Sequence, residues 1–193
     1  MKRNIFVLLI VLFLLVISNL VLFAEESNYD FRKTNWGMSK EQVKATENEK
    51  PFAELDNYLN YSVRVNEKDC FCEYYFLEDK LYKSTYMYSF GGLPTDFDIY
   101  INDYDNLKEF LTKIYGKPKG DEVVWKNDLY KRKRPEWGTA IILGYLTYGT
   151  LWETPATEIV VMFKGIDKYM FIWINYASKE LKEWAEQILK EKK

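Results

Sequence analysis

The stretch YMFIWINY, residues 169–176, indicates a β-strand with two unlike faces. Successive side chains of a strand point to opposite faces of a sheet. One face carries Met170, Ile172, Ile174 and Tyr176. Phe171 and Trp173 share the other face. If helices cover the aliphatic face, the aromatic pair points away from them, so the stretch predicts a sheet with rings on its second face.

Strand-like stretches also occur on both sides of a break at Gly91-Gly92-Leu93-Pro94. The candidates are Tyr58–Asn66, Cys70–Leu77, Lys80–Phe90, Glu122–Tyr130, Thr139–Tyr148 and Thr157–Lys164. Glu78-Asp79 has the composition of a tight hairpin turn. Short strands joined by tight turns favour antiparallel pairing.

Two of the three expected helices lie near the ends of the mature chain. Ser39 and Gln42 form a capping box for a short helix that ends near Glu47. The last helix begins at Ser178 and runs to the C-terminus. Its apolar side chains recur at helical spacing: Leu181, Trp184, Ala185, Ile188 and Leu189.

The middle helix has the clearest periodicity. Its apolar residues fall on one stripe: Leu107, Phe110, Leu111, Ile114 and Tyr115. Asp103 or Asp105 can cap its start, and Gly116 can supply a left-handed stop.

The order of helices and strands predicts the α+β class. We expect an antiparallel sheet built from two loose helix-plus-meander repeats, with the C-terminal helix packed on one face. The length of 193 residues fits one domain over 25–193, which can divide into lobes 25–92 and 93–193.

Residues 1–24 have the pattern of a secretory signal peptide. Lys2 and Arg3 precede an apolar run that ends at Ala24, and acidic sequence follows. The alternative is a membrane anchor through residues 5–24, since a segment of 20 residues, apolar apart from Ser18 and Asn19, is just long enough to span a bilayer. Either route places the remaining chain outside the cytoplasm, secreted or periplasmic.

Composition excludes several function classes. The chain has no His, which removes His-based triads and His metal sites. Without Lys2 and Arg3, the chain has 25 basic and 29 acidic residues and therefore a net negative charge. Nucleic-acid binding needs a basic surface, so we do not expect it here. No serine-nucleophile motif is present. We therefore expect no enzyme and no cofactor.

The acidic cluster Asp96, Asp98, Asp103 and Asp105 fits a calcium loop poorly. A loop starting at Asp98 would place Tyr100 where a ligand is needed and Asp103 where Gly is needed. Helix capping and solvation explain the cluster better, so we expect no metal site.

Cys70 and Cys72 share one face of a predicted strand. Cysteine is often buried, and these two are interpreted as small buried residues. The alternative is a redox or soft-metal role.

The run Lys131-Arg132-Lys133-Arg134 is interpreted as a solvated hairpin loop. The alternative is weak contact with an anionic membrane surface or an acidic partner, in which Arg132, Arg134 and Trp137 take part.

Three motifs carry a resemblance to known proteins: Trp36-Gly37-Met38-Ser39 with Val43, Tyr115-Gly116-Lys117-Pro118, and Trp152-Glu153-Thr154. Together they resemble a group of uncharacterised secreted bacterial proteins. More remotely, the helix-plus-meander repeat resembles the β-lactamase inhibitory protein fold and the small lipoprotein of the outer-membrane assembly machine. These resemblances imply a binding or scaffolding module.

Aromatic residues on the strands indicate the binding surface. Tyr82, Tyr86 and Tyr88 alternate on one face of their strand, and Phe171 and Trp173 on one face of theirs. Burial on both sides of a bent sheet is the alternative. We expect a non-catalytic binding module of the cell envelope that recognises a protein partner. A glycan-binding module using the aromatic sheet face, or a hydrolase with unidentified carboxylates, are the alternatives.

The signal pattern predicts cleavage after Ala24. The intact mass of the protein recovered from its native host should therefore lack residues 1–24. A full-length mass in the membrane fraction would reject cleavage in favour of the anchor.

Overall fold

The computed structural model describes residues 29–65, 68–90, 98–167 and 169–191. The expected signal segment, residues 1–24, and the break at residues 91–94 lie outside this part of the chain. Among the helices that the structure describes, none is long and apolar enough to cross a membrane.

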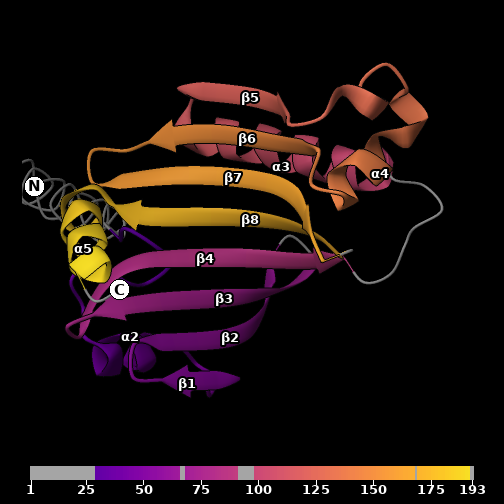
Figure 1. Cartoon of the computed structure of the whole chain (residues 1–193). Helices are drawn as coiled ribbons and strands as arrows, with labels where there is room; N and C mark the ends of the chain where they lie inside the picture. Colours follow the sequence, from indigo (N-terminus) through magenta and orange to yellow (C-terminus); the bar gives the residue numbers. More distant parts are fainter. Residues whose placement is uncertain (1–28, 66–67, 91–97, 168, 192–193) are drawn as a thin grey trace, which may run out of the picture.

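Eight antiparallel strands form one continuous sheet (Figure 1). Their order in the sheet is β1-β2-β3-β4-β8-β7-β6-β5. The strands are β1 (Ala53–Leu55), β2 (Tyr58–Val65), β3 (Lys68–Leu77), β4 (Lys80–Phe90), β5 (Gly120–Trp125), β6 (Leu146–Glu153), β7 (Thr157–Ile166) and β8 (Tyr169–Ser178). The two meanders, β1–β4 and β5–β8, meet where β4 pairs with β8.

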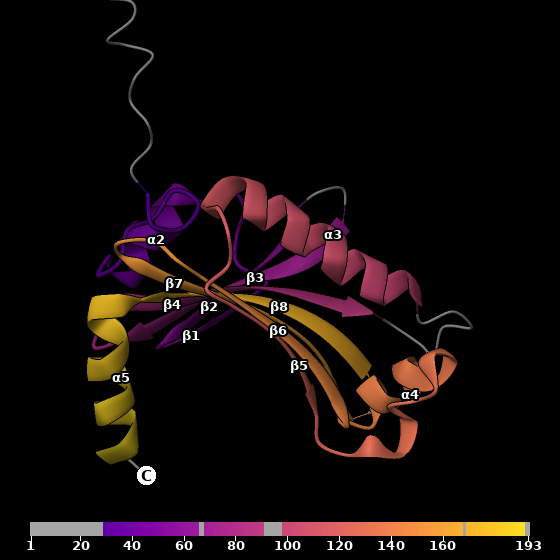
Figure 2. The same ribbon diagram turned by 90° about the horizontal axis from the view of Figure 1, so that it is seen from above.

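Four helices accompany the sheet in the described part of the chain: α2 (Lys40–Thr46), α3 (Asp98–Tyr115), α4 (Trp137–Ile142) and α5 (Lys179–Glu191). Figure 2 shows α2 and α3 on one face, which we call the helix face. The sheet bends away from α3, and α5 projects from one end on the opposite side. Each meander follows a helix, which confirms the predicted α+β class and its repeat.

Local turn chemistry works as the sequence predicts. The Ser39 side chain accepts from the Gln42 N–H, and the Gln42 side chain accepts from the Ser39 N–H, which completes the capping box. Glu78 and Asp79 have φ values of 47° and 57°, which fits a tight hairpin turn between β3 and β4. Gly116 ends α3 with a φ of 79°.

The expected strand Thr139–Tyr148 is wrong, because α4 occupies its first half. A short apolar run does not distinguish a strand from a buried helix by periodicity. Pro135 before this helix and Gly144 after it, with a φ of 70°, are the signals that mark it. The expected strand Glu122–Tyr130 is too long, since β5 ends at Trp125 and a 3₁₀ turn follows.

Two expectations for α3 are also wrong. The helix begins at Asp98, so neither Asp103 nor Asp105 caps it, and Asp103 instead pairs with Lys68 at 2.5 Å. Phe110 and Ile114 are 41% and 54% exposed. The helix buries a narrower stripe than predicted, formed by Ile101, Tyr104 and Leu111.

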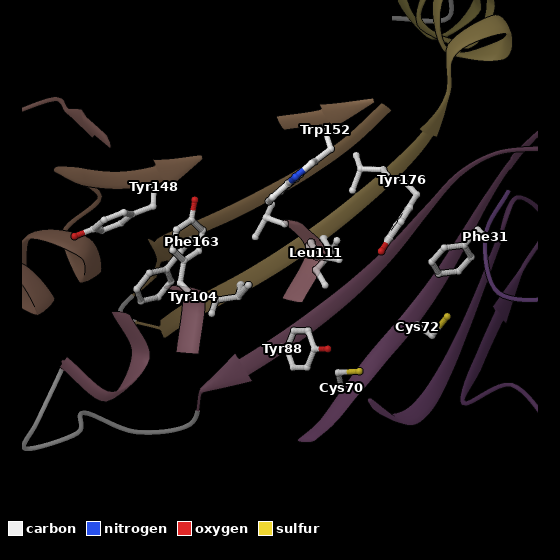
Figure 3. Close-up of a cluster of buried hydrophobic side chains, with 14 of the residues drawn as sticks. Phe31, Cys70, Cys72, Tyr88, Tyr104, Leu111, Tyr148, Trp152, Phe163 and Tyr176 are labelled. Atoms are coloured by element: carbon white, nitrogen blue, oxygen red, sulfur yellow. The ribbon is translucent and has the colours of Figure 1, made fainter. Parts of the chain in front are cut away.

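The core lies between the helix face and the helices, and it is rich in aromatic rings (Figure 3). Tyr104 of α3 stacks on Phe163 of β7 with centroids 6.2 Å apart, and its hydroxyl lies 2.5 Å from Thr150 Oγ1. Trp152 donates its indole N–H to the Gly116 carbonyl at 3.0 Å. These polar contacts fix the position of α3 on the sheet.

The C-terminal helix packs against the sheet less deeply than its stripe predicts. Ala185 is its only buried residue among those described. The Lys80 ammonium lies 5.3 Å from the ring centre of Trp184, and Lys182 pairs with Glu158 of β7 at 2.5 Å. Helix α5 therefore stands at the end of the sheet.

A substitution at Gly165 of β7 tests how closely α4 packs on the sheet. A Cβ on Gly165 would lie 2.2 Å from the Ile141 carbonyl oxygen, a backbone atom of α4. Gly165→Ala should therefore lower the free energy of unfolding by about 1–3 kcal/mol, measured by denaturant titration.

Gly149→Ala is the matched control, since a Cβ there meets nothing within 4 Å. The control should change stability by less than about 0.5 kcal/mol. Equal effects of the two substitutions would contradict close packing of α4 on β7.

Candidate functional site

The second face of the sheet, which we call the open face, is turned toward the viewer in Figure 1. In β6, β7 and β8 every second residue is buried on the helix face, and the alternate residues are half-buried on the open face. Helices α2, α3 and α4 pack on the helix face, and α5 borders the open face at one end. The open face is therefore the large uncovered surface of the described structure.

Strand register places an apolar row across the middle of the open face. Phe71 pairs with Met87, Met87 with Trp173, and Trp173 with Met162. Phe171 stacks on Trp173 with ring centroids 4.9 Å apart. This apolar row joins strands from both meanders.

A polar row runs beside the apolar row, two residues away on each strand. Glu73 pairs with Thr85, and Thr85 pairs with Asn175. Thr85 donates its hydroxyl to Asn175 Oδ1 at 3.1 Å, which leaves the Asn175 amide nitrogen as a donor. The two rows together give a face of mixed polarity.

Between the rows lies a hollow of about 140 Å³. Its lining residues come from four adjacent strands and are Glu73, Tyr75, Lys83, Thr85, Met162, Lys164, Trp173 and Asn175. We call it the central hollow. It is large enough for one side chain of a partner, and it is open to solvent.

The single carboxylate of the central hollow is already hydrogen-bonded. Glu73 accepts from the Tyr58 hydroxyl at 2.6 Å and from the Tyr75 hydroxyl at 2.8 Å. Burial and the hydrogen bond to Glu73 raise the pKa of Tyr58 to about 12, so this phenol stays a donor. Glu73 is thus held in place by two tyrosines.

Two lysines lie on the rim of the central hollow, each beside an aromatic ring. The Lys83 ammonium lies 4.8 Å from the ring centre of Tyr75, and the Lys164 ammonium lies 5.2 Å from that of Trp173. Neither lysine forms an ion pair with another residue that the structure describes. Burial lowers the pKa of Lys83 below its ordinary value, and the nearby charge of Glu73 opposes this effect only in part.

The predicted binding residues lie on opposite faces of the sheet and do not form one surface. Phe171 and Trp173 lie on the open face, as their strand pattern predicts. Tyr86 pairs with Ile174 and Tyr88 with Ile172, so both tyrosines lie on the helix face.

On the helix face, Tyr86 and Tyr88 line a groove of about 250 Å³ beneath α3, with Phe110 and Ile114 in its wall. Tyr82 lies beside the register shift between β3 and β4, where burial raises its pKa. None of these tyrosines extends the apolar row.

The basic run lies at the far end of the molecule, between two 3₁₀ turns. Lys131 pairs with Asp128 at 3.2 Å, and Lys133 pairs with Glu136 at 3.3 Å. Arg132 is exposed, and the Arg134 guanidinium lies 4.5 Å from the Trp137 ring centre. Local acidic residues thus pair with both lysines of the run, and the run lies apart from the open face.

Sequence reasoning missed Lys83, Lys164, Met162 and Asn175. Alternation within a strand shows which residues of that strand share a face with each of them, but not which faces of different strands lie on the same side of the sheet. Only the pairing of β4 with β8 and of β7 with β8 shows that these faces are the same one.

Comparison of the chain with known protein families, curated proteins and solved structures gave no match. The resemblances suggested by its motifs stay predictions. In the described residues no group of three or more His, Cys, Asp or Glu is arranged to hold a metal ion.

Cys70 and Cys72 point to the helix face of β3, where both are buried as free thiols (Figure 3). The prediction that they are small buried residues on one face is confirmed. Burial raises the pKa of Cys70 to about 11 and that of Cys72 to about 12. A thiol with such a pKa is almost entirely protonated at neutral pH and is a poor nucleophile.

Both thiols should therefore resist an aromatic disulfide reagent at pH 8 in the native protein. Unfolding in guanidinium should release two reactive thiols per chain. Ser62→Cys, at an exposed site of the open face, is the positive control and should react at once. Rapid reaction of the unsubstituted native protein would contradict the burial of this pair.

Proposed function

We propose that this protein is a non-catalytic binding module, exported to the cell envelope, that recognises a protein partner through the open face. The observation that carries the proposal is the apolar row from Phe71 to Met162 on a surface that helices α2, α3 and α4 leave uncovered. An uncovered row of rings and thioethers favours association with another macromolecule. Export is proposed from the signal pattern of residues 1–24.

The size of the open face suits a protein partner. Eight strands about 4.8 Å apart span roughly 34 Å, and six of them, with 8–11 residues each, rise roughly 30 Å. The resulting area of roughly 1,000 Å² exceeds the ~800 Å² that each partner buries in a standard interface. The sheet can supply such an interface without a change in backbone.

The engagement of Trp173 favours a protein over a glycan. Its ring already stacks on Phe171 and carries the Lys164 ammonium at 5.2 Å. A sugar that stacks on an aromatic ring needs a free ring face. An apolar centre with polar groups around it is instead the usual composition of a protein interface.

Affinity capture with matched variants tests the proposal. Wild-type protein should retain a stoichiometric protein from envelope extract of its native host. Trp173→Ala should weaken that capture at least about tenfold, which corresponds to 1.4 kcal/mol, because a central ring contributes strongly to binding. Phe71→Ala, at the other end of the apolar row, should act in the same direction.

Phe110→Ala is the control, since it removes a ring of 41% exposure from the helix side. It should leave capture unchanged. Denaturant unfolding should show that each variant remains folded. Undiminished capture by Trp173→Ala, or binding to purified wall polymer in place of protein, would overturn the proposal.

A further inference from the structure

Nothing that the structure describes requires glycine at position 149. Gly149 lies in the interior of β6, where it pairs with Glu122 of β5 and with Met162 of β7. Its backbone is not in the left-handed region, and a Cβ there would meet nothing within 4 Å. Glycine weakens a strand, and within one it often marks a place where a ligand or another chain approaches closely. The space above Gly149 thus brings no benefit to the fold.

The missing side chain leaves a hollow of about 380 Å³ on the open face, which we call the glycine hollow. It spans β5, β6 and β7, and its apolar walls are Val124, Leu151, Val160 and Met162. Met162 also lines the central hollow, so the glycine hollow continues the apolar row toward the β5 edge of the sheet. It is a separate recess of the same surface.

Both charged residues that line the glycine hollow are acidic. Glu158 already pairs with Lys182 of α5 at 2.5 Å. Glu122 is exposed and forms no ion pair with another residue that the structure describes. It lies directly beside the gap, because it is the β5 partner of Gly149. A protein that covers this part of the open face removes the Glu122 carboxylate from water, which is costly unless a cation pairs with it.

We infer that the glycine hollow receives a basic side chain, an arginine or a lysine, of the protein partner. The methylene stem of that side chain lies over Gly149 against Leu151 and Met162, and its charged group reaches the Glu122 carboxylate. A purely aliphatic side chain would fill the same space but leave Glu122 unpaired. An acidic side chain would be repelled by Glu122 and Glu158.

This inference rests on the proposed function, since it names a group that the open face recognises. It accounts for both unexplained features of this region, the glycine and the unpaired carboxylate. Rings and thioethers bind many surfaces, whereas a partner without a basic residue at this point would leave Glu122 desolvated. The glycine hollow would therefore contribute specificity to an interface whose affinity comes largely from the apolar row.

Substitutions that fill the glycine hollow test the inference. The partner isolated by capture with wild-type protein is purified and titrated against each variant. Gly149→Leu should weaken binding at least tenfold, because the new side chain occupies the space of the basic one. Gly149→Ala should weaken it at least twofold. Both variants should keep the wild-type midpoint of denaturant unfolding, and if Gly149→Leu lowers that midpoint, Gly149→Ala decides.

The matched control for added bulk is Lys113→Leu, which places the same side chain at an exposed site of α3 and should leave binding unchanged. Glu122→Gln tests the charge and should weaken binding at least fivefold, with a smaller dependence on salt concentration. Its control is Glu109→Gln, which removes an exposed carboxylate from α3 and should have no effect.

Undiminished binding of a folded Gly149→Leu variant, or of Glu122→Gln, would overturn the inference. A loss with Gly149→Leu alone would show an apolar occupant and would also overturn it. If Trp173→Ala weakens binding while Gly149→Leu and Glu122→Gln do not, this inference alone falls. If Trp173→Ala keeps its partner at full affinity, the proposed function falls.

Discussion

The pairing of β4 with β8 is the interaction on which the rest of the structure depends. It joins the two meanders over eight residue pairs, from Lys83 and Ala177 to Phe90 and Met170. A shift of one residue would exchange the two faces of one meander relative to the other. The helix face would then receive Met87 and Thr85 in place of Tyr86 and Tyr88, and neither the core nor the open face would be continuous.

The same register assigns the aromatic residues to two different tasks. Tyr104, Tyr148 and Phe163 pack on the helix face, where the Tyr104 hydroxyl has Thr150 as its partner. Trp173 and Phe71, on the opposite face, have strand neighbours but no covering helix among the described elements. The high aromatic content of the chain thus serves one core and one surface, whereas a sheet buried on both sides would need two cores.

Alternation and turn chemistry predict most of the elements because they are local properties. The turn at Glu78-Asp79 and the capping box at Ser39 require only neighbouring residues, and both lie where the sequence places them. The strand β1, Ala53–Leu55, is too short to show a period. Helix α4 replaces part of an expected strand because its apolar run fits both structures, so that Pro135, Gly144 and the contact with β7 decide in favour of the helix.

The surface could be predicted only in part, since it depends on pairs of residues far apart in the sequence. The pattern of residues 169–176 places Trp173 opposite the helices, and this holds. Nothing local brings Lys83 and Lys164, 81 positions apart, to one hollow. Both line it because β8 pairs with both β4 and β7.

The charged residues of the central hollow differ from many others in the protein, which form ion pairs. Glu47 binds Arg32 through two hydrogen bonds of 2.9 Å, and Glu153 binds both Lys119 and Lys179. A contact between an ammonium and a ring contributes only about 0.5–1 kcal/mol at an exposed site. This is small beside the free energy that it costs to remove the Lys83 ammonium from water. Departures of this kind from local consistency tend to occur at functional sites. The lysines of the open face thus add little to the stability of the fold, which agrees with the binding role proposed for this face.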